Sequence, residues 1–299
     1  MQRPDIVYFC SKVTNTHLSL LPIMKNIFKS LLFLFFILPS LSIAQSAADK
    51  KIQAGLTFNA GANWLSPSSN KIEANGGGSL LSIGLNVHSA LKSSQNLAIA
   101  TGLEFDFGKN VYSPNTSGYT FVDYLQDDVV LTNEEASAAS SFETMQLLSR
   151  NVSSTKLTIP LMLLFRTNFI GDFRYFGKFG LRNSFLLTHS IADDGIQTTL
   201  GIPNGEAIST TLMSSPGEMF LYNGSIGLTA GAEWNFVGST CLVLEAGYYY
   251  GITPYFLDRK DENKTMYNIG TELIFPPNKE YYSASARQNQ LIFKLSILF

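Results

Sequence analysis

The chain ends with Arg287-Gln-Asn-Gln-Leu-Ile-Phe-Lys-Leu-Ser-Ile-Leu-Phe299, in which apolar residues occupy every second position from Leu291 onward. The predicted strand therefore has one continuous apolar face, while Lys294 and Ser296 lie on the other. An unpaired strand this apolar would aggregate in water, whereas a closed barrel in a membrane pairs both of its edges. The pattern predicts the last strand of a transmembrane β-barrel. Its C-terminal insertion signal would consist of Phe293, Leu295, Ile297 and Phe299.

Seven further segments show the same alternation, which is the period of a strand with two different faces. One of them contains Pro160, which cannot donate a hydrogen bond to a neighbouring strand. Together with the terminal strand they predict an all-β fold, an eight-stranded antiparallel up-and-down barrel. The expected strands cover about residues 51–64, 79–91, 96–108, 156–168, 173–188, 221–236, 241–256 and 287–299.

The connections between these segments alternate strictly between short and long. Short links of hairpin length lie at 92–95, 169–172 and 237–240. Outer-membrane barrels have short periplasmic turns and long outer loops, so both termini are expected on the periplasmic side. A ten-stranded barrel remains an alternative, with an extra hairpin in 109–155 or 189–220. The long links cover 65–78, 109–155, 189–220 and 257–286.

With that orientation, aromatic residues gather at both rims, where their amphipathic rings favour the lipid–water boundary. Packing within the sheet is the alternative explanation, because aromatic residues are common in strands. The expected outer rim holds Trp64, Phe105, Phe107, Tyr255 and Phe256. The expected periplasmic rim holds Phe169, Phe173, Tyr175, Trp234, Phe236 and Phe299.

The composition suits such a barrel. Only 15% of the residues are charged, 22 are Phe and 23 are Gly, yet no long apolar run follows residue 44. The alternative is a soluble, lipocalin-like barrel, in which the apolar rows would face inward and the Gly-rich, charged rows outward. A net charge of −2 argues against nucleic-acid binding.

The beginning of the chain predicts export. Residues 24–44 place basic residues, an apolar run at 31–38 and small residues in the order of a secretory signal peptide. A membrane anchor is the alternative, but Pro39 interrupts a run that would need roughly 20 apolar residues. We expect residues 1–23 to be an upstream extension from an over-long gene start, and 45–299 to be the barrel domain. Gln45 in place of a Cys argues against a lipid anchor. The expected mature chain holds one thiol, that of Cys241, so no internal disulfide is expected.

The rows opposite the apolar ones contain four acidic and four basic residues. An eight-stranded barrel is just wide enough to be filled by side chains, and a lone buried charge costs several kcal/mol, so these groups must pair. We expect a lumenal ion-pair network that fills the barrel; a selective pore or a proton path is the functional alternative. The network would comprise Glu104, Asp106, Arg166, Lys178, Arg182, Glu233, Glu245 and Lys294.

No catalytic, cofactor or metal motif is found in the sequence. Asn86 and His88 share one face of a predicted strand, and some outer-membrane lipases use Asn, His and Ser on a barrel wall. Here the pair points to the lumen together with Ser82, whereas those lipases place the group on the lipid side. We therefore expect a structural histidine and no enzyme, cofactor or metal.

One helix is expected within the link 109–155. Thr132 and Glu135 have the spacing of a capping box, and residues 134–148 are rich in Ala, Glu, Gln and Leu. Phe142 and Met145 could pack against the barrel mouth or a partner; a solvated helix is the preferred alternative.

Four stretches resemble the PorT-like outer-membrane β-barrel family of the Bacteroidetes type. They are Ser42-Ile-Ala-Gln45, Lys156-Leu-Thr-Ile-Pro-Leu-Met-Leu-Leu-Phe165, Tyr175-Phe-Gly-Lys-Phe-Gly-Leu181 and Tyr248-Tyr-Tyr-Gly-Ile-Thr253. The resemblance covers about 45–299 and implies the fold. One member type assists secretion of surface proteins, and many members have no assigned activity.

These observations predict a bacterial outer-membrane barrel with a structural or interaction role through its long outer loops. Expected partners are outer-membrane lipid, the barrel-assembly machinery at the C-terminal strand, and a protein at 109–155 and 189–220. A small channel or transporter is the main functional alternative, and a membrane-embedded hydrolase a further one.

Overall fold

The computed structural model describes residues 51–91, 94–115, 119–126, 129–199, 202–215, 218–237, 240–269 and 279–299. The chain divides into two compact units, Met1–Gln45 and Ser46–Phe299, and the described residues belong to the second. The expected upstream extension and signal peptide, at 1–23 and 24–44, lie outside the described residues. Within the described ranges, no helix combines the length and the apolar character needed to cross a bilayer.

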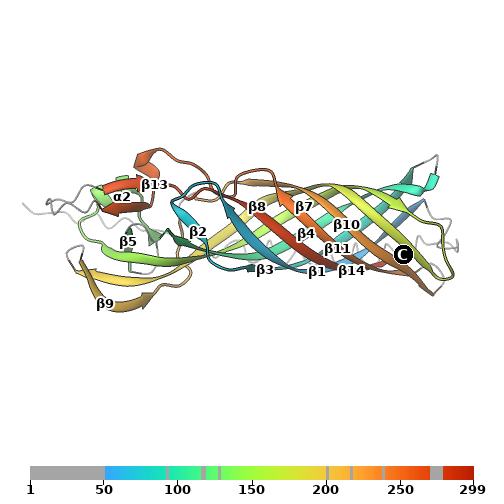
Figure 1. Cartoon of the computed structure of the whole chain (residues 1–299), viewed down its shortest axis with the longest axis horizontal. Helices are drawn as coiled ribbons and strands as arrows, with labels where there is room; N and C mark the ends of the chain where they lie inside the picture. Colours follow the sequence, from blue (N-terminus) through green and yellow to red (C-terminus); the bar gives the residue numbers. More distant parts are fainter. Residues whose placement is uncertain are drawn as a thin grey trace, which may run out of the picture. The chain divides into compact units, whose positions relative to one another are not determined.

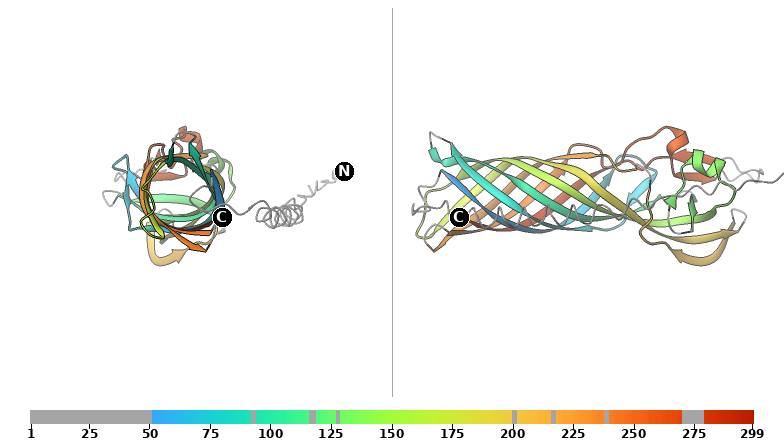
Figure 2. Two further views of the ribbon diagram at one scale, coloured as in Figure 1. Left: turned by 90° about the vertical axis from the view of Figure 1, so that its right-hand side faces the viewer. Right: turned by 180° about the vertical axis from the view of Figure 1, so that it is seen from behind.

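Eight antiparallel strands form a closed ring, seen end-on in the left view of Figure 2. The last strand closes it, because Leu295 lies opposite Phe58 on one neighbour and opposite Leu244 on the other. The predicted eight-stranded barrel is confirmed. In ring order the strands are β1 (Ile52–Pro67), β3 (Gly78–Leu91), β4 (Ser94–Pro114), β7 (Glu143–Arg166), β8 (Phe173–Thr199), β10 (Tyr222–Val237), β11 (Thr240–Gly251) and β14 (Ala286–Leu298).

The barrel is apolar outside and polar inside. On β7, the exposed residues Ile159, Leu161 and Phe165 alternate with the buried residues Thr158 and Arg166. The predicted insertion residues are likewise exposed: Phe293, Leu295 and Ile297 on β14, and Phe299 directly after it. We call the outward apolar rows around the ring, including 157–165 on β7 and 291–297 on β14, the apolar belt. The lipocalin-like alternative is wrong, because the charged rows lie inside.

Three strands continue beyond the apolar belt, and their two faces exchange character there. On β7, the outward row changes from Leu157 to Thr155, Ser153 and Asn151. The inward row adds apolar residues such as Val152 and Met145 beside the buried Arg150. On β4, the exposed Phe107 is followed in the outward row by the exposed Lys109. A strand whose apolar face turns inward is suited to water. The belt on β7 is thus nine residues long, which matches the roughly 9–11 residues of a tilted strand in a bilayer.

The continuing ends of β4, β7 and β8 build a second sheet region at the long-link end of the barrel, labelled in Figure 1 by β5, β9 and β13. We call this region the extension. It has its own apolar core, which includes Val122, Met145, Ile191, Met213 and Met266. Its additional strands are β2 (Ile72–Ala74), β5 (Thr120–Leu125), β6 (Val129–Val130), β9 (Ile202–Ser209), β12 (Met266–Ile269) and β13 (Lys279–Tyr282), with one 3-10 turn, η4 (Asp261–Asn263).

The extension corrects the expectation of long loops, since much of 109–155 and of 189–220 is strand, and 257–286 contains the short strands β12 and β13. The predicted helix is also shorter than expected: α2 covers only Asn133–Ala138. The capping box of Thr132 and Glu135 is present, but β7 begins at Glu143 because Met145 pairs with both β5 and β8 and is buried. Hidden strands do exist in these links, yet they lie outside the ring, so the barrel stays eight-stranded.

Two of the expected rim aromatics also belong to the extension. Tyr255 and Phe256 are buried in its apolar core and do not reach the barrel surface. Trp64 does reach that surface, where its ring stacks on Tyr248 with the centroids 5.9 Å apart. At the short-turn end, Phe173 stacks on Trp234 at the same distance.

Candidate functional site

The structure brings all eight predicted lumenal residues together inside the barrel, where each is at most 8% exposed. They come from six of the eight strands, because each strand turns every second residue inward. The residues are Glu104, Asp106, Arg166, Lys178, Arg182, Glu233, Glu245 and Lys294.

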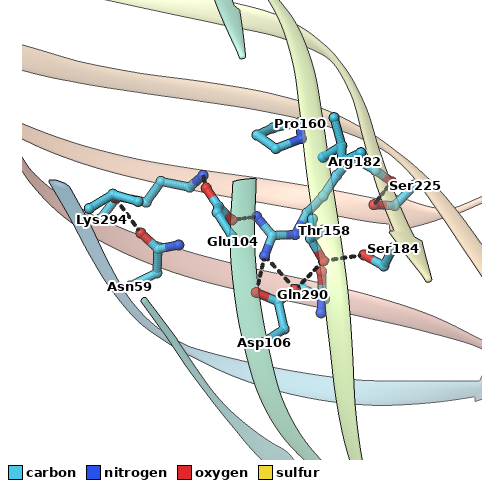
Figure 3. Close-up of polar contacts among 12 residues, drawn as sticks. Asn59, Glu104, Asp106, Thr158, Pro160, Arg182, Ser184, Ser225, Gln290 and Lys294 are labelled. Carbon is cyan, nitrogen blue, oxygen red and sulfur yellow. Dashed lines mark hydrogen bonds and ion pairs between the residues drawn. The ribbon is translucent and has the colours of Figure 1, made fainter. Parts of the chain in front are cut away.

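The middle of the lumen is organised by Arg182 (Figure 3). Its Nη1 donates to Glu104 Oε2 at 2.5 Å, and its Nη2 donates to Asp106 Oδ2 at 2.7 Å. Glu104 also accepts from Lys294 Nζ at 2.7 Å, so two cations share one carboxylate. Thr158 Oγ1 donates to Asp106 Oδ2 at 2.6 Å, so the Asp106 carboxylate is bound by Thr158 as well as by Arg182. Charge-assisted bonds of this length are the strong ones. They join strands that are not neighbours in the ring, since Arg182 on β8 and Lys294 on β14 both bind carboxylates on β4.

The short-turn end of the lumen contains a second group. Glu233 pairs with Arg166, Nε to Oε1 at 3.1 Å, and with Arg174. Glu245 accepts from Lys178 Nζ at 2.6 Å. His88 lies between these pairs, with Nδ1 2.7 Å from Arg166 Nη2 and Nε2 3.3 Å from Lys178 Nζ. The histidine considered for a hydrolase therefore lies inside the lumen among cations, and it is 1% exposed.

Two lumenal cations were missed in the sequence, and they change the expected charge balance. Arg174 faces inward at the start of β8, and Lys156 faces inward opposite Asp106. Both obey the alternation that identified the other eight, so the signal was present but fell at the ends of the predicted segments. The described lumen therefore holds six basic and four acidic side chains, and the expected balanced set is wrong.

Close packing fills the space around these charges. Tyr249 is 1% exposed and lies under the Arg182 guanidinium, with 5.6 Å between the ring centroid and Cζ. At Gly180 an added Cβ would lie 2.2 Å from the backbone oxygen of Leu161, so this position beside the charges has no room for a larger residue. Among the described residues, no group of His, Cys, Asp or Glu has the arrangement of a metal site. The network thus links the barrel walls through ion pairs and hydrogen bonds.

A separate buried ion-pair group lies in the extension. Arg150 Nη1 donates to Glu218 Oε1 at 2.8 Å, and its other nitrogens bind Asp193. Burial opposes the charge of this guanidinium, but Asp193 and Glu218 together raise the pKa of Arg150 well above its ordinary value. Arg150 therefore stays charged and holds a strand of the extension to the segment that follows β9.

Comparison with known proteins bears on the barrel as a whole. Residues 43–257, more than half of the chain, match the family described as outer membrane protein beta-barrel domain. No curated protein sequence matches the chain. Similar solved structures include Ail of Yersinia pestis, at 8% identity and a TM-score of 0.32, which covers 84% of this chain and 100% of that one.

Two further structures are similar at the same low level. Neisserial surface protein A, NspA, has 10% identity and a TM-score of 0.31, covering 83% of this chain and 99% of that one. The outer membrane protease OmpT of Escherichia coli has 8% identity and a TM-score of 0.31, covering 86% and 99%. Similarity at this level supports no argument about what the chain does. The family match, together with the closed barrel and its apolar belt, leads to one conclusion: the chain belongs to the outer membrane protein beta-barrel domain family and is a protein of the bacterial outer membrane.

Proposed function

We propose that the barrel of this protein is a rigid scaffold whose lumen is filled by side chains. The function of the protein is then carried by the extension, which binds a protein partner outside the cell. The observation that supports this proposal is the exchange of faces on β4, β7 and β8 at the edge of the apolar belt. Continuous strands place a water-suited sheet region, with its own apolar core, directly on the membrane-spanning barrel. A region built this way is positioned by rigid elements, which favours specific binding.

The proposed orientation places the extension outside and both termini in the periplasm, because outer-membrane barrels have their short turns on the periplasmic side. A short peptide tag inserted after Gly205 in β9 tests it, with the same tag after Gly171 in the β7–β8 turn as the matched control. Both glycines have a positive φ and open space where a Cβ would lie. On intact cells, an antibody should label the Gly205 tag and not the Gly171 tag; the reverse result would overturn the orientation.

The proposed partner surface lies at 109–155 and 189–220, and the resemblance to PorT-like barrels favours a partner in an envelope or secretion assembly. Leu212 is 82% exposed on this surface, whereas Thr210 and Met213, on either side of it in the chain, are buried. A photo-crosslinking residue at Leu212 should give a discrete product on cells, and the same residue at Leu161 in the apolar belt should not. No product from Leu212 or from the exposed Tyr119 would argue against a protein partner.

Two further interactions belong to the proposal. Outer-membrane lipid would contact the apolar belt, and the barrel-assembly machinery would bind β14 during insertion. Both are expected of a barrel whose final strand presents Phe293, Leu295, Ile297 and Phe299 outward.

A small channel is the second candidate function, and the excess of six basic over four acidic lumenal side chains favours it. Recordings in planar bilayers separate the two. A filled lumen predicts no steady single-channel steps. Steps of constant size would show that the barrel is a channel and not a filled scaffold. For a hydrolase, activity lost on His88→Ala would be the required result. We expect no activity, because the ring nitrogens of His88 contact Arg166 and Lys178 inside the lumen, with Glu233 at 3.9 Å.

A further inference from the structure

A buried carboxylate lies in the extension on the face of the sheet opposite its apolar core. Asp123 in β5 is buried and follows Val122 of that core, so its side chain lies on the other face. Its Oδ1 accepts from the Tyr267 hydroxyl at 2.7 Å and from Thr144 Oγ1 at 2.6 Å. Its Oδ2 accepts from Lys279 Nζ at 2.8 Å. One oxygen is thus bound within the sheet, and the other is bound by an ammonium group.

Aromatic rings surround this ammonium group. Lys279 Nζ lies 4.1 Å from the centroid of the Tyr267 ring and 5.5 Å from that of Phe142. Tyr281 extends the aromatic wall, with its ring centroid 5.1 Å from that of Tyr267. Aromatic rings within about 6 Å of an ammonium group attract it electrostatically, and such arrangements recognise amines. We call Asp123, Phe142, Tyr267 and Tyr281 the ammonium cage.

The side chain of Lys279 connects the cage to solvent. It is 29% exposed, whereas the side chain of Asp123 is only 2% exposed. Lys279 is the first residue of β13, and its backbone lies opposite Ile269 in the β12–β13 pair. The ammonium group can therefore leave the cage while the strands stay paired. A buried carboxylate left in this way must bind another cation, because an unpaired buried charge is costly.

We infer that the ammonium cage is a binding site for a primary alkylammonium group, and that Lys279 occupies it until an external ligand takes its place. The hydrogen bond to Asp123 Oδ2 selects a primary ammonium, because a quaternary ammonium has no hydrogen to donate. A free amine and a lysine side chain of another protein both end in this group. The cage would bind it whether or not the extension binds a protein partner.

Removal of the Lys279 side chain should open the site. In Lys279→Ala the Asp123 carboxylate loses its cation, so limited proteolysis in detergent micelles should cleave 109–155 faster. n-Butylammonium, which has the four carbons of a lysine side chain, should slow this cleavage about tenfold at roughly ten times its dissociation constant. Tetramethylammonium should not. If the variant does not fold, the same two salts are compared during refolding by the yield of folded protein. Equal effects of the two salts, or none from either, would overturn the inference.

Two further variants serve as controls. Lys71 also pairs with a carboxylate, that of Glu280, and lies 5.7 Å from the centroid of the Tyr282 ring, but both charged side chains are exposed. Lys71→Ala should therefore be cleaved like the unmodified protein and should not respond to n-butylammonium. Lys279→Met fills the cage with an uncharged side chain, so it should be cleaved faster than the unmodified protein and gain no protection from the amine.

Calorimetric titration with n-butylammonium tests the exchange in the unmodified protein. Lys279→Ala should bind it most tightly, and the unmodified protein less tightly, because Lys279 competes as an intramolecular ligand. Acetyl-lysine methylamide distinguishes the two sources of the group: equal affinity would support a lysine of another protein, and absence of binding a free amine. No more heat from the unmodified protein than from Lys279→Met would show that Lys279 does not leave the cage, and would overturn the inference.

Discussion

Arg150 and Asp193 face each other across β7 and β8 and form a two-point ion pair inside the extension. Arg150 Nε donates to Asp193 Oδ1 and Nη2 to Asp193 Oδ2, each at 2.7 Å, and both side chains are fully buried. Buried pairs of this kind are weak evidence for net stability, but breaking one leaves an unpaired buried charge. The pair therefore makes the fold of the extension sensitive to a single substitution, separately from the barrel.

Asp193→Ala should destabilise the extension by about 3–5 kcal/mol, because it leaves the Arg150 guanidinium buried with Glu218 as its remaining carboxylate. Limited proteolysis of the protein in detergent micelles should show faster cleavage within 109–155 and 189–220. The heat-modified gel shift of the barrel should stay the same. Asp194→Ala is the matched control, since Asp194 is half-buried and, among the described residues, accepts from the hydroxyl groups of Ser149 and Ser209. Equal cleavage of the two variants would show that the pair does not hold the extension.

Arg182→Met should destabilise the barrel itself. It removes the guanidinium that bridges Glu104 and Asp106, and Asp106 loses its cation while Glu104 keeps Lys294. We expect a loss of about 3–5 kcal/mol, read as a lower midpoint of heat modification. Adding Asp106→Asn should recover part of this loss, because it removes the unpaired charge. If the double variant is less stable than Arg182→Met alone, the cavity left by the Arg182 guanidinium, and not the unpaired charge of Asp106, determines the loss of stability.

The edge of the apolar belt can be located by placing arginine at two outward positions of β7. Leu161→Arg places a charge in the middle of the belt, where it should cost about 2–4 kcal/mol. Asn151→Arg places the same residue ten positions earlier in the extension, where the outward row is polar, and should be tolerated. Folding yield into lipid vesicles measures the difference. Equal yields would mean that the belt does not end between these positions.

The extension should lose stability in strongly alkaline solution. Burial, followed by the nearby Asp123 carboxylate, raises the pKa of Tyr281 to about 12 from an ordinary value of 10.0. The neutral phenol is thus favoured by the folded state, so its contribution is present below pH 10.0 and is lost as the pH rises toward about 12. Burial and Asp123 shift the pKa of Tyr267 in the same direction.

Phenolate absorbance during a pH titration of the folded protein checks this. The signal that disappears in Tyr281→Phe should have its midpoint near pH 12 and should move to lower pH in Asp123→Asn. An unchanged midpoint in Asp123→Asn would show that burial alone determines the shift.

Local periodicity was enough to predict the ring of eight strands. In a barrel wall every residue faces either the outside or the lumen, so the alternation of Leu295 with Lys294 or of Phe105 with Glu104 already indicates which side is apolar. The same alternation identified the lumenal charges, and it missed Arg174 and Lys156 only because strand ends are poorly marked in a sequence. Links such as 109–155 lack this clear pattern, because there the outward and inward rows exchange character.

The amino-acid sequence by itself therefore determined the strand number, the inward charged rows and the outward apolar rows, because each depends on neighbours two residues apart. The tertiary structure alone decided that β7 continues from Phe165 back to Glu143, and that Arg150 meets Asp193 and Glu218. It also decided that Lys156 meets Gln288 and no carboxylate of the described residues. These contacts join residues that are 43, 68 and 132 positions apart, and such distances leave no periodic trace in a sequence.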